Sequence, residues 1–142
     1  GWKNSHMMKT ICPAFLNALP AAWRSAIKNC TKYSDNTGGG NDTASYVTAT
    51  TQKIFLLAEF EVHGTRYYAN SAEKNYQKQY DYYKNGNSKV KNQHSSTGSA
   101  CGWWLRSVNA SSTTSFCYVS TDGSAYGTNA CYSYGFAPGF DL

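Results

Sequence analysis

The chain has 142 residues, a length that suits a single domain with its own hydrophobic core. Charged residues make up only 15% of it, aromatic residues another 15%, and the formal net charge is +5. Without a basic stripe interleaved with aromatics, or an apolar run of the roughly 18 residues that a membrane span needs, we expect neither nucleic-acid binding nor membrane insertion by this segment.

The first eight residues, Gly1–Met8 (GWKNSHMM), look like a cloning remnant with a start at Met7 or Met8. We therefore leave residues 1–8 out of the expected fold, which becomes one domain over residues 9–142.

Apolar residues at three- and four-residue steps predict a helix over residues 11–28. We expect its apolar face to lie in the core, and Pro20 predicts a kink or two short helices. The face consists of Leu16, Leu19, Trp23, Ala26 and Ile27.

Three consecutive glycines in residues 36–42 (NTGGGND) predict a loop or hairpin tip, and no Lys-Ser/Thr follows them as in a phosphate-binding loop. Strands are predicted on either side of a short polar step, at residues 45–51 (SYVTATT) and 54–57 (IFLL).

Glu59, Glu61 and His63 follow these strands, and their pattern has two interpretations. Alternation in an extended segment would place two acids beside a histidine, as in a metal or acid–base site, although no other residue supports one. A short helix that starts near Ala58 fits equally well and would make Glu59 and His63 neighbours one turn apart.

Tyrosines spaced at Tyr76, Tyr80 and Tyr83 predict a helix over residues 75–84, with these rings packed on one face. The polar residues 86–98 predict a loop.

The last third predicts short strands joined by turns. Strands are expected at residues 103–105 (WWL), at 116–119 (FCYV) and from Ala125 onward, with a tight turn at Asp122-Gly123 and a closing segment at 136–140 (FAPGF). Helices near the start followed by strands indicate an α+β fold.

The five cysteines have no zinc-ligand spacing, and their odd number excludes a fully paired framework within one chain. We expect buried or partly buried thiols with at most one disulfide, between Cys12 and Cys30. His6, His63 and His94 are scattered, so no metal site and no cofactor is expected.

Residues 105–142 contain no Lys, Glu, Gln, Met or Trp, although these five types occur 23 times in the 104 residues before. Turn-rich segments favour Gly, Asn, Ser and Asp, which is one explanation. The other explanation is genetic, because all codons for these five residue types end in a purine and none ends in a pyrimidine. Mutagenesis of adenines in Asn codons would produce such a gap.

Three C-terminal motifs carry a family resemblance: WWLRS (103–107), FCYVSTDGSA (116–125) and YSYGFAPGF (132–140). In this combination they resemble a family of uncharacterised domains that is common in gut bacteria and their phages. The upstream segments FLNALPAAWRSAIK, KIFLLAEFEVHG and YYKNGNSKVK match the same family, so the resemblance extends from about Cys12 to the end.

The resemblance implies a C-type lectin fold of the formylglycine-generating-enzyme type, with N-terminal helices packed on short antiparallel sheets and a loop-rich C-terminal third. Variable proteins of diversity-generating retroelements use this scaffold. Arg106 would be a structural polar anchor. The frame would consist of Trp103, Trp104, Leu105, Phe116, Cys117, Val119, Gly135, Pro138 and Phe140.

The resemblance also implies a variable ligand-binding surface within residues 106–136, and no catalytic residue. The ligand would be a protein or glycan on a cell or host surface, and the domain would be extracellular, on a bacterial cell or phage particle. A non-variable adhesive module and, less favoured, an enzyme of the formylglycine-generating branch are the alternatives. The contact residues would be Asn109, Ser111, Ser112, Thr113, Thr114, Tyr118, Ser124, Tyr126, Thr128, Asn129, Tyr132 and Tyr134.

Asp122 and Asp141 are too sparse for the calcium site of sugar-binding lectins, which needs clustered oxygen ligands. Tyrosines should dominate the contact energy, because binding energy concentrates in Tyr, Trp and Arg.

Overall fold

The N-terminal segment is packed into the fold. A computed structural model describes all residues from 1 to 142, and in it Trp2 is only 1% exposed, in a core cluster that Met7 and Met8 also contact. Leaving Gly1–Met8 outside the fold is therefore wrong, because the Trp2 ring fills part of the core. Two short helical turns, η1 (Trp2–Asn4) and η2 (Met7–Ile11), shape this segment.

The predicted break at Pro20 is confirmed, since α1 (Cys12–Ala18) and α2 (Ala21–Ala26) are separate helices. Their apolar face is only partly in the core. Ile27 is buried, but Trp23 is 50% exposed and lies edge-on to Phe140 at 6.0 Å. The core position expected for Trp23 is wrong because α2, a helix of six residues, turns this side chain toward solvent.

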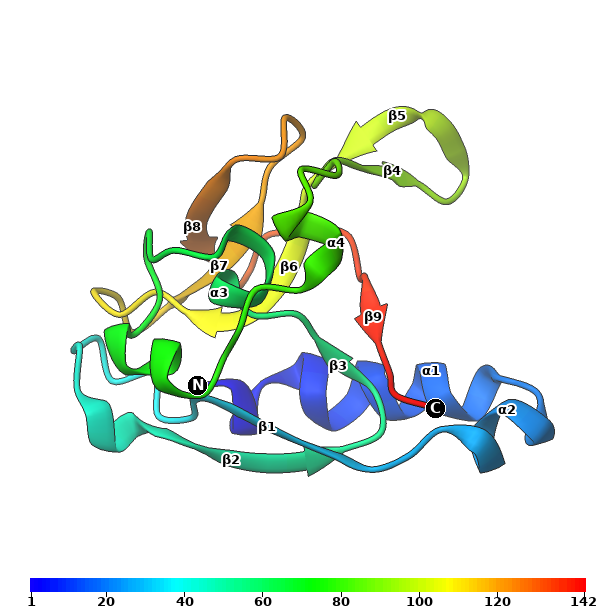
Figure 1. Ribbon diagram of the computed structural model, residues 1–142, viewed down its shortest axis with the longest axis horizontal. Coiled ribbons are helices and arrows are strands. Elements are labelled where there is room, and N and C mark those ends of the chain that lie inside the picture. The colour runs from blue at the N-terminus through cyan, green and yellow to red at the C-terminus, as the bar shows by residue number, and fades with distance from the viewer.

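The first of four small antiparallel sheets follows the helices (Figure 1). The strands β1 (Cys30–Asp35) and β2 (Val47–Gln52) form a long hairpin. The predicted loop at residues 36–42 is confirmed as part of its connection, which also holds the turn η3 (Ala44–Tyr46).

The buried strand β3 (Phe55–Leu56) pairs with β9 (Pro138–Gly139) near the end of the chain. The helical interpretation of the next segment is confirmed, because α3 (Glu59–His63) begins after Ala58. Gly64 ends this helix with a φ of 72°, a left-handed conformation that glycine adopts without strain.

The helix predicted over residues 75–84 is largely wrong, because only η4 (Ser71–Asn75) and α4 (Asp81–Lys84) are helical. Tyr83 is buried as expected, whereas Tyr76 is exposed and stacks on Tyr33 with ring centroids 4.3 Å apart. Of the three tyrosines that were expected to pack on one face, only Tyr83 is therefore in the core.

The polar segment before the last third contains a hairpin where a loop was expected. The strands β4 (Lys91–Gln93) and β5 (Ser96–Cys101) pair with each other, and Figure 1 shows them projecting from the body. Their residues are almost all exposed, so this hairpin adds little to the core.

The last third forms a three-stranded sheet in the order β6 (Trp103–Val108), β7 (Ser115–Val119) and β8 (Ala125–Asn129). This arrangement confirms the predicted strands and the turn at Asp122-Gly123. Successive side chains of a strand point to opposite faces, and both faces of this sheet meet core clusters.

One core cluster contains Trp103, Leu105, Cys117 and Val119 against α3 and Tyr83. The other contains Trp104, with Phe116 and Tyr118 packed against it, and is covered by the N-terminal segment and α1. The molecule is a mixed α+β fold with few helices and small antiparallel sheets, as predicted. None of its helices has the length and apolar character that crossing a membrane requires.

Candidate functional site

Three of the tyrosines predicted to contact a ligand lie together on one face of the β6–β7–β8 sheet. Tyr118 of β7 is directly opposite Tyr126 of β8, with ring centroids 6.0 Å apart. Tyr134 arrives from the segment after β8 and stacks on Tyr118 at 4.4 Å and an interplanar angle of 18°. Thr128 shares this face with Tyr126, because the two are separated by one residue in the same strand.

Trp104 lies at the base of these tyrosines. Its indole packs edge-on against Tyr134 at 5.1 Å and against Tyr118 at 6.1 Å, both favourable aromatic geometries. Exposure increases from Trp104, which is buried, through Tyr118 and Tyr134, which are half-buried, to Tyr126, which is 46% exposed. We call Trp104, Tyr118, Tyr126 and Tyr134 the aromatic face.

The hydroxyl group of Tyr118 is neutral at physiological pH because its pKa is raised. Burial and the neighbouring hydroxyl of Tyr134 raise the pKa of Tyr118 to about 12. The face can therefore offer flat apolar area together with the neutral hydroxyl of Tyr118, which can donate and accept hydrogen bonds.

A second group of predicted contact residues lies around the β6–β7 loop. Thr114 Oγ1 donates to Asn129 Oδ1 at 2.9 Å, and Ser112 and Ser115 continue the same chain of side-chain hydrogen bonds. Asn109 Oδ1 accepts from the backbone N–H of Ser111 and so shapes the loop.

Because Asn129 is opposite Ser115, one residue out of phase with Tyr126 and Thr128, its side chain points to the other face of the sheet. Thr113 is exposed at the same loop, close to Gly40. The loop polar groups are thus largely engaged with one another and are separate from the aromatic face.

Two predicted contact residues lie apart from both groups. Ser124 is in the tight turn, where its backbone N–H donates to Asp122 Oδ1 at 2.9 Å. Tyr132 follows β8 and is 57% exposed, with no aromatic partner within stacking distance. The structure therefore divides the twelve predicted positions rather than gathering them into one surface.

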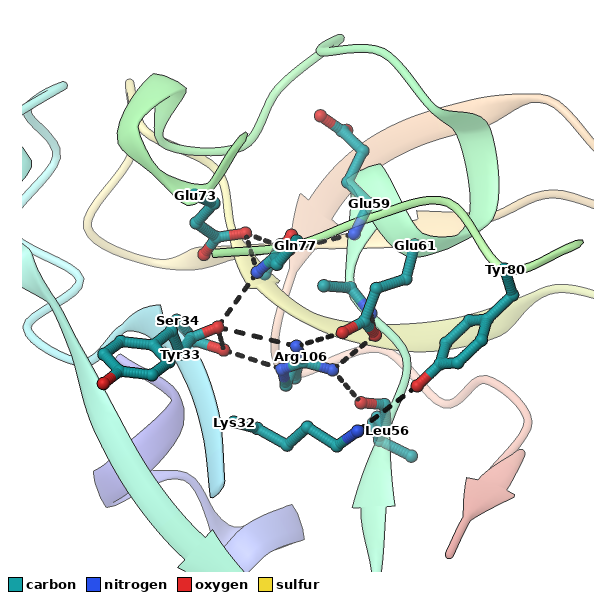
Figure 2. A network of polar contacts seen from close by, with 12 residues as sticks. Lys32, Tyr33, Ser34, Leu56, Glu59, Glu61, Glu73, Gln77, Tyr80 and Arg106 are labelled. Atoms are coloured by element: carbon teal, nitrogen blue, oxygen red, sulfur yellow. Dashed lines mark hydrogen bonds and ion pairs between the residues drawn. The ribbon is translucent and has the colours of Figure 1, made fainter. Parts of the chain in front are cut away.

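Arg106 anchors β6, the strand that also carries Trp104, through the polar network shown in Figure 2. Its guanidinium donates to both carboxylate oxygens of Glu61, at 2.6 and 2.7 Å, to Ser34 Oγ at 2.8 Å and to the carbonyl oxygen of Leu56 at 2.7 Å. Burial lowers the pKa of Arg106, but the carboxylates of Glu61 and Glu73 raise it by more, so the side chain stays charged. The anchor role expected for Arg106 is confirmed.

Sequence reasoning missed Glu73, and it did not predict that Glu59 would accept hydrogen bonds from the backbone. Glu59 accepts hydrogen bonds from the backbone N–H groups of Tyr67, Tyr68 and Ala69. Glu73 accepts from Ser107 Oγ at 2.6 Å and from the backbone N–H of Asp35 at 2.9 Å. Burial raises the pKa of Glu73 by more than these hydrogen bonds lower it.

The possible metal or acid–base site at Glu59, Glu61 and His63 is not formed. Both carboxylates are occupied by backbone N–H groups or by Arg106, and no group of three His, Cys, Asp or Glu side chains could hold a metal. Burial and, less strongly, the charge of Lys89 lower the pKa of His63 to about 4.

All five cysteines are free thiols, so the possible Cys12–Cys30 disulfide is not formed. Burial raises the pKa of Cys12 to about 12, and burial with the nearby charge of Glu59 raises that of Cys117 well above its ordinary value. Cys117 is therefore a packing residue of the frame. Cys131 is the exposed thiol, in the loop after β8.

A profile of the family described as "Domain of unknown function (DUF6273)" matches residues 1–142. No curated protein and no solved structure is significantly similar to the chain. Because the profile covers the whole chain, with the buried N-terminal segment as well as the C-terminal sheet, the chain belongs to the DUF6273 family.

Proposed function

We propose that this domain binds a protein or glycan ligand through the aromatic face, with Tyr126 as its most exposed ring and with Tyr132, which lies outside that face, as a further exposed contact. The observation that carries the proposal is the graded exposure of the aromatic face above a fixed, buried anchor. Tyrosine suits such a surface because it provides large contact area and a polar hydroxyl at low cost in conformational entropy.

The rigidity of the base supports the proposal. Trp104 is held by β6 and by two edge-on contacts, and Tyr134 packs so closely on Gly102 that a Cβ atom there would lie 2.8 Å from its ring. Preorganised side chains lose less entropy on binding than mobile ones. We propose the same face for either class of ligand, since rings stack on sugars and on apolar side chains alike.

A binding screen tests this proposal. The domain would be presented to an array of bacterial and mucin glycans and to a phage-displayed random peptide library. We expect capture of at least one ligand, and a fall of roughly tenfold or more in affinity for Tyr126→Ala, as for a residue that carries binding energy.

Tyr82→Ala is the matched control for Tyr132→Ala, because both tyrosines are 57% exposed but Tyr82 lies on α4 and is not among the proposed contact residues. Ligands that bind wild type, Tyr126→Ala and Tyr132→Ala equally would refute the proposed face, as would a screen without any capture.

We further propose that the scaffold is of the C-type lectin type and that a retroelement diversifies the exposed positions within residues 106–136 of a surface-displayed bacterial or phage protein. The gap in residue types after Trp104 supports this, together with the resemblance of the three C-terminal motifs. The genomic DNA tests it: a near-identical repeat with Asn codons at the exposed positions, beside a reverse transcriptase gene, is expected. Without such a repeat, a non-variable adhesive module is the better description.

A further inference from the structure

A polar cleft of about 630 Å³ lies between the loop that follows α3 and the segment that runs from η4 toward α4. Only one of its nine lining residues is hydrophobic, and this residue, Phe60, is buried. The lining contains three basic residues, Arg66, Lys74 and Lys78, and no acidic residue. The cleft therefore combines positive charge with many groups that can form hydrogen bonds.

Contacts within the protein fix the position of Arg66 in this cleft. Its Nε–H donates to the carbonyl oxygen of Ala69 at 2.8 Å, and its Nη2 lies 3.1 Å from Asp42 Oδ2. Asp42 Oδ1 accepts from the backbone N–H of Ser71 at 2.7 Å, so the ion pair also joins the loop of Arg66 to η4. The Nη1 group of Arg66 has no partner in the protein and is available to a ligand.

Lys74 and Lys78 supply positive charge that the protein does not compensate. Both lysines are exposed, and neither ammonium group forms an ion pair within the protein. Asp42 compensates only the charge of Arg66. Because a cleft lined by charges of one sign concentrates ions of the opposite sign, the ligand that complements this cleft is an anion.

Neutral polar side chains line the cleft beside these lysines. The Nε2–H of Gln79 donates to the carbonyl oxygen of Val62 at 3.0 Å, which holds the amide in place. Its Oε1 accepts no hydrogen bond within the protein and is open to solvent. The hydroxyl groups of Thr65 and Ser71 belong to the same lining. Such groups match the hydroxyl groups of a sugar, which both donate and accept.

Size and lining limit the class of anion. The volume is within the range of about 300–1,000 Å³ that is usual for small-molecule pockets, and it exceeds what a simple ion needs. Three basic residues are fewer than the about four to eight that mark binding to an anionic membrane. The buried Phe60 offers no exposed ring on which a nucleic-acid base could stack. Peptides commonly bind along a strand edge or an apolar groove, and this cleft has neither.

We propose that this cleft binds an acidic sugar unit that carries a carboxylate or a sulfate group. The acidic group pairs with Lys74 and Lys78, while Nη1 of Arg66 and the neutral polar side chains bind the hydroxyl groups.

The acidic-sugar site is separate from the aromatic face. Phe60 belongs to the core cluster of Trp103, whereas Trp104 belongs to the cluster on the opposite face of the sheet. Binding in the cleft therefore does not depend on the function proposed for the tyrosines.

Titration followed by nuclear magnetic resonance tests the site directly. Glucuronate is added to the isotope-labelled protein and compared with glucose, which has a hydroxymethyl group in place of the carboxylate. We expect saturable shifts of the backbone N–H signals of Thr65 and Lys78, and no shift of the signal of Tyr126. Glucose should bind at least roughly tenfold more weakly, the affinity equivalent of one charge-assisted hydrogen bond.

Two double variants with the same net charge separate the cleft from general charge attraction. Lys74→Gln/Lys78→Gln should weaken glucuronate binding roughly tenfold or more and leave glucose binding unchanged. The control Lys9→Gln/Lys28→Gln removes the same charge from exposed lysines that do not line the cleft, and it should bind glucuronate as wild type does.

Further ligands identify the acidic group and test the contribution of the sugar ring. Glucose sulfate compared with glucuronate shows which acidic group the site prefers. Acetate and the acidic dipeptide N-acetylaspartylglutamate should both bind more weakly than the preferred sugar. The proposal is overturned if neither acidic sugar gives a saturable shift, if glucose, acetate or the dipeptide binds as tightly as the preferred sugar, or if the two double variants lose affinity equally.

Discussion

Both carboxylate oxygens of Glu61 accept hydrogen bonds from the guanidinium of Arg106, and both side chains are almost completely buried. The pair connects α3 to β6 and thereby joins the N-terminal two thirds of the chain to the sheet that carries the aromatic face. One of the Glu61 oxygens also accepts from the backbone N–H of Ala58, which fixes the start of α3.

We expect Glu61→Gln to lower the free energy of unfolding by about 3–5 kcal/mol, because it leaves the charge of Arg106 buried without its counter-ion. Denaturation by urea measures this. The matched control is Asp42→Asn, which removes the charge from the half-exposed Arg66–Asp42 pair at 3.1 Å and should cost about 1 kcal/mol or less. Equal effects of the two substitutions would mean that the buried pair is not an anchor.

The stacked rings of Tyr118 and Tyr134 should be energetically coupled. A double-mutant cycle with Tyr118→Ala, Tyr134→Ala and the double variant is expected to give a coupling free energy of about 0.5–1.5 kcal/mol. The cycle Tyr118–Tyr82 is the control, because these rings do not touch. Strict additivity for Tyr118 and Tyr134 would contradict the stacked arrangement.

Exposed and buried aromatics of the C-terminal sheet should differ clearly in stability. We expect Tyr126→Ala and Tyr132→Ala to change the free energy of unfolding by about 1 kcal/mol or less, as is usual at exposed sites. Trp104→Ala should cost about 3–5 kcal/mol through the cavity that it leaves. Thermal and urea denaturation of the three variants measure the difference. Similar losses for all three would make the tyrosines packing residues.

The N-terminal segment should contribute directly to stability. Trp2→Ala is expected to cost about 3–5 kcal/mol, because it empties a buried site in the core. Lys3→Ala, at an exposed neighbouring position, should have little effect. Urea denaturation compares the two, and a Trp2→Ala variant as stable as wild type would show that the segment only covers the surface.

His63 should titrate at unusually low pH, with a pKa of about 4, because burial disfavours its charged form. Because the pKa of His63 is lower in the folded than in the unfolded chain, the neutral imidazole contributes to the free energy of unfolding. This contribution is fully present above about pH 6.5 and is lost as the pH falls toward 4. The imidazole signal, assigned with His63→Gln, reports the midpoint.

The stability of His63→Gln should accordingly depend less on pH between about 4 and 6.5 than that of wild type. A His63 titration midpoint near 6.5 would contradict the burial of its ring.

The strands of the last third could be predicted from sequence because their apolar runs are short, rich in aromatic and β-branched residues and separated by turn residues. The break between α1 and α2 was equally predictable, since Pro20 cannot continue the first helix. Local sequence signals of this kind predict secondary structure correctly where no tertiary contact favours a different backbone conformation.

Tertiary hydrogen bonds explain why the helix predicted over residues 75–84 was wrong. Gln77 Nε2 donates to the carbonyl oxygen of Tyr33, Gln79 Nε2 donates to that of Val62, and the backbone N–H of Tyr80 donates to that of Glu61. These partners on β1 and α3 hold the segment in an extended path, and no spacing of tyrosines within the segment reveals them.

The candidate site was predictable residue by residue but not as a surface. Side-chain alternation places Tyr126 and Thr128 on one face, but their position opposite Tyr118 depends on the register of β7 and β8. The stacking of Tyr134 on Tyr118 comes from a segment outside the sheet. Trp2 was missed because residues 1–8 were set aside, although a tryptophan there was a signal for burial.

The hydrogen-bond partners of the Arg106 side chain all precede Leu105 in the chain: the carbonyl oxygens of Tyr33 and Leu56, Ser34 Oγ and the carboxylate of Glu61. The residues that hold Arg106 and its strand β6 in place therefore lie far upstream in the sequence. Substitutions at Tyr126, Thr128 or Tyr132 would leave the contacts of Arg106 unchanged. Many alternative surfaces are therefore compatible with one folded core.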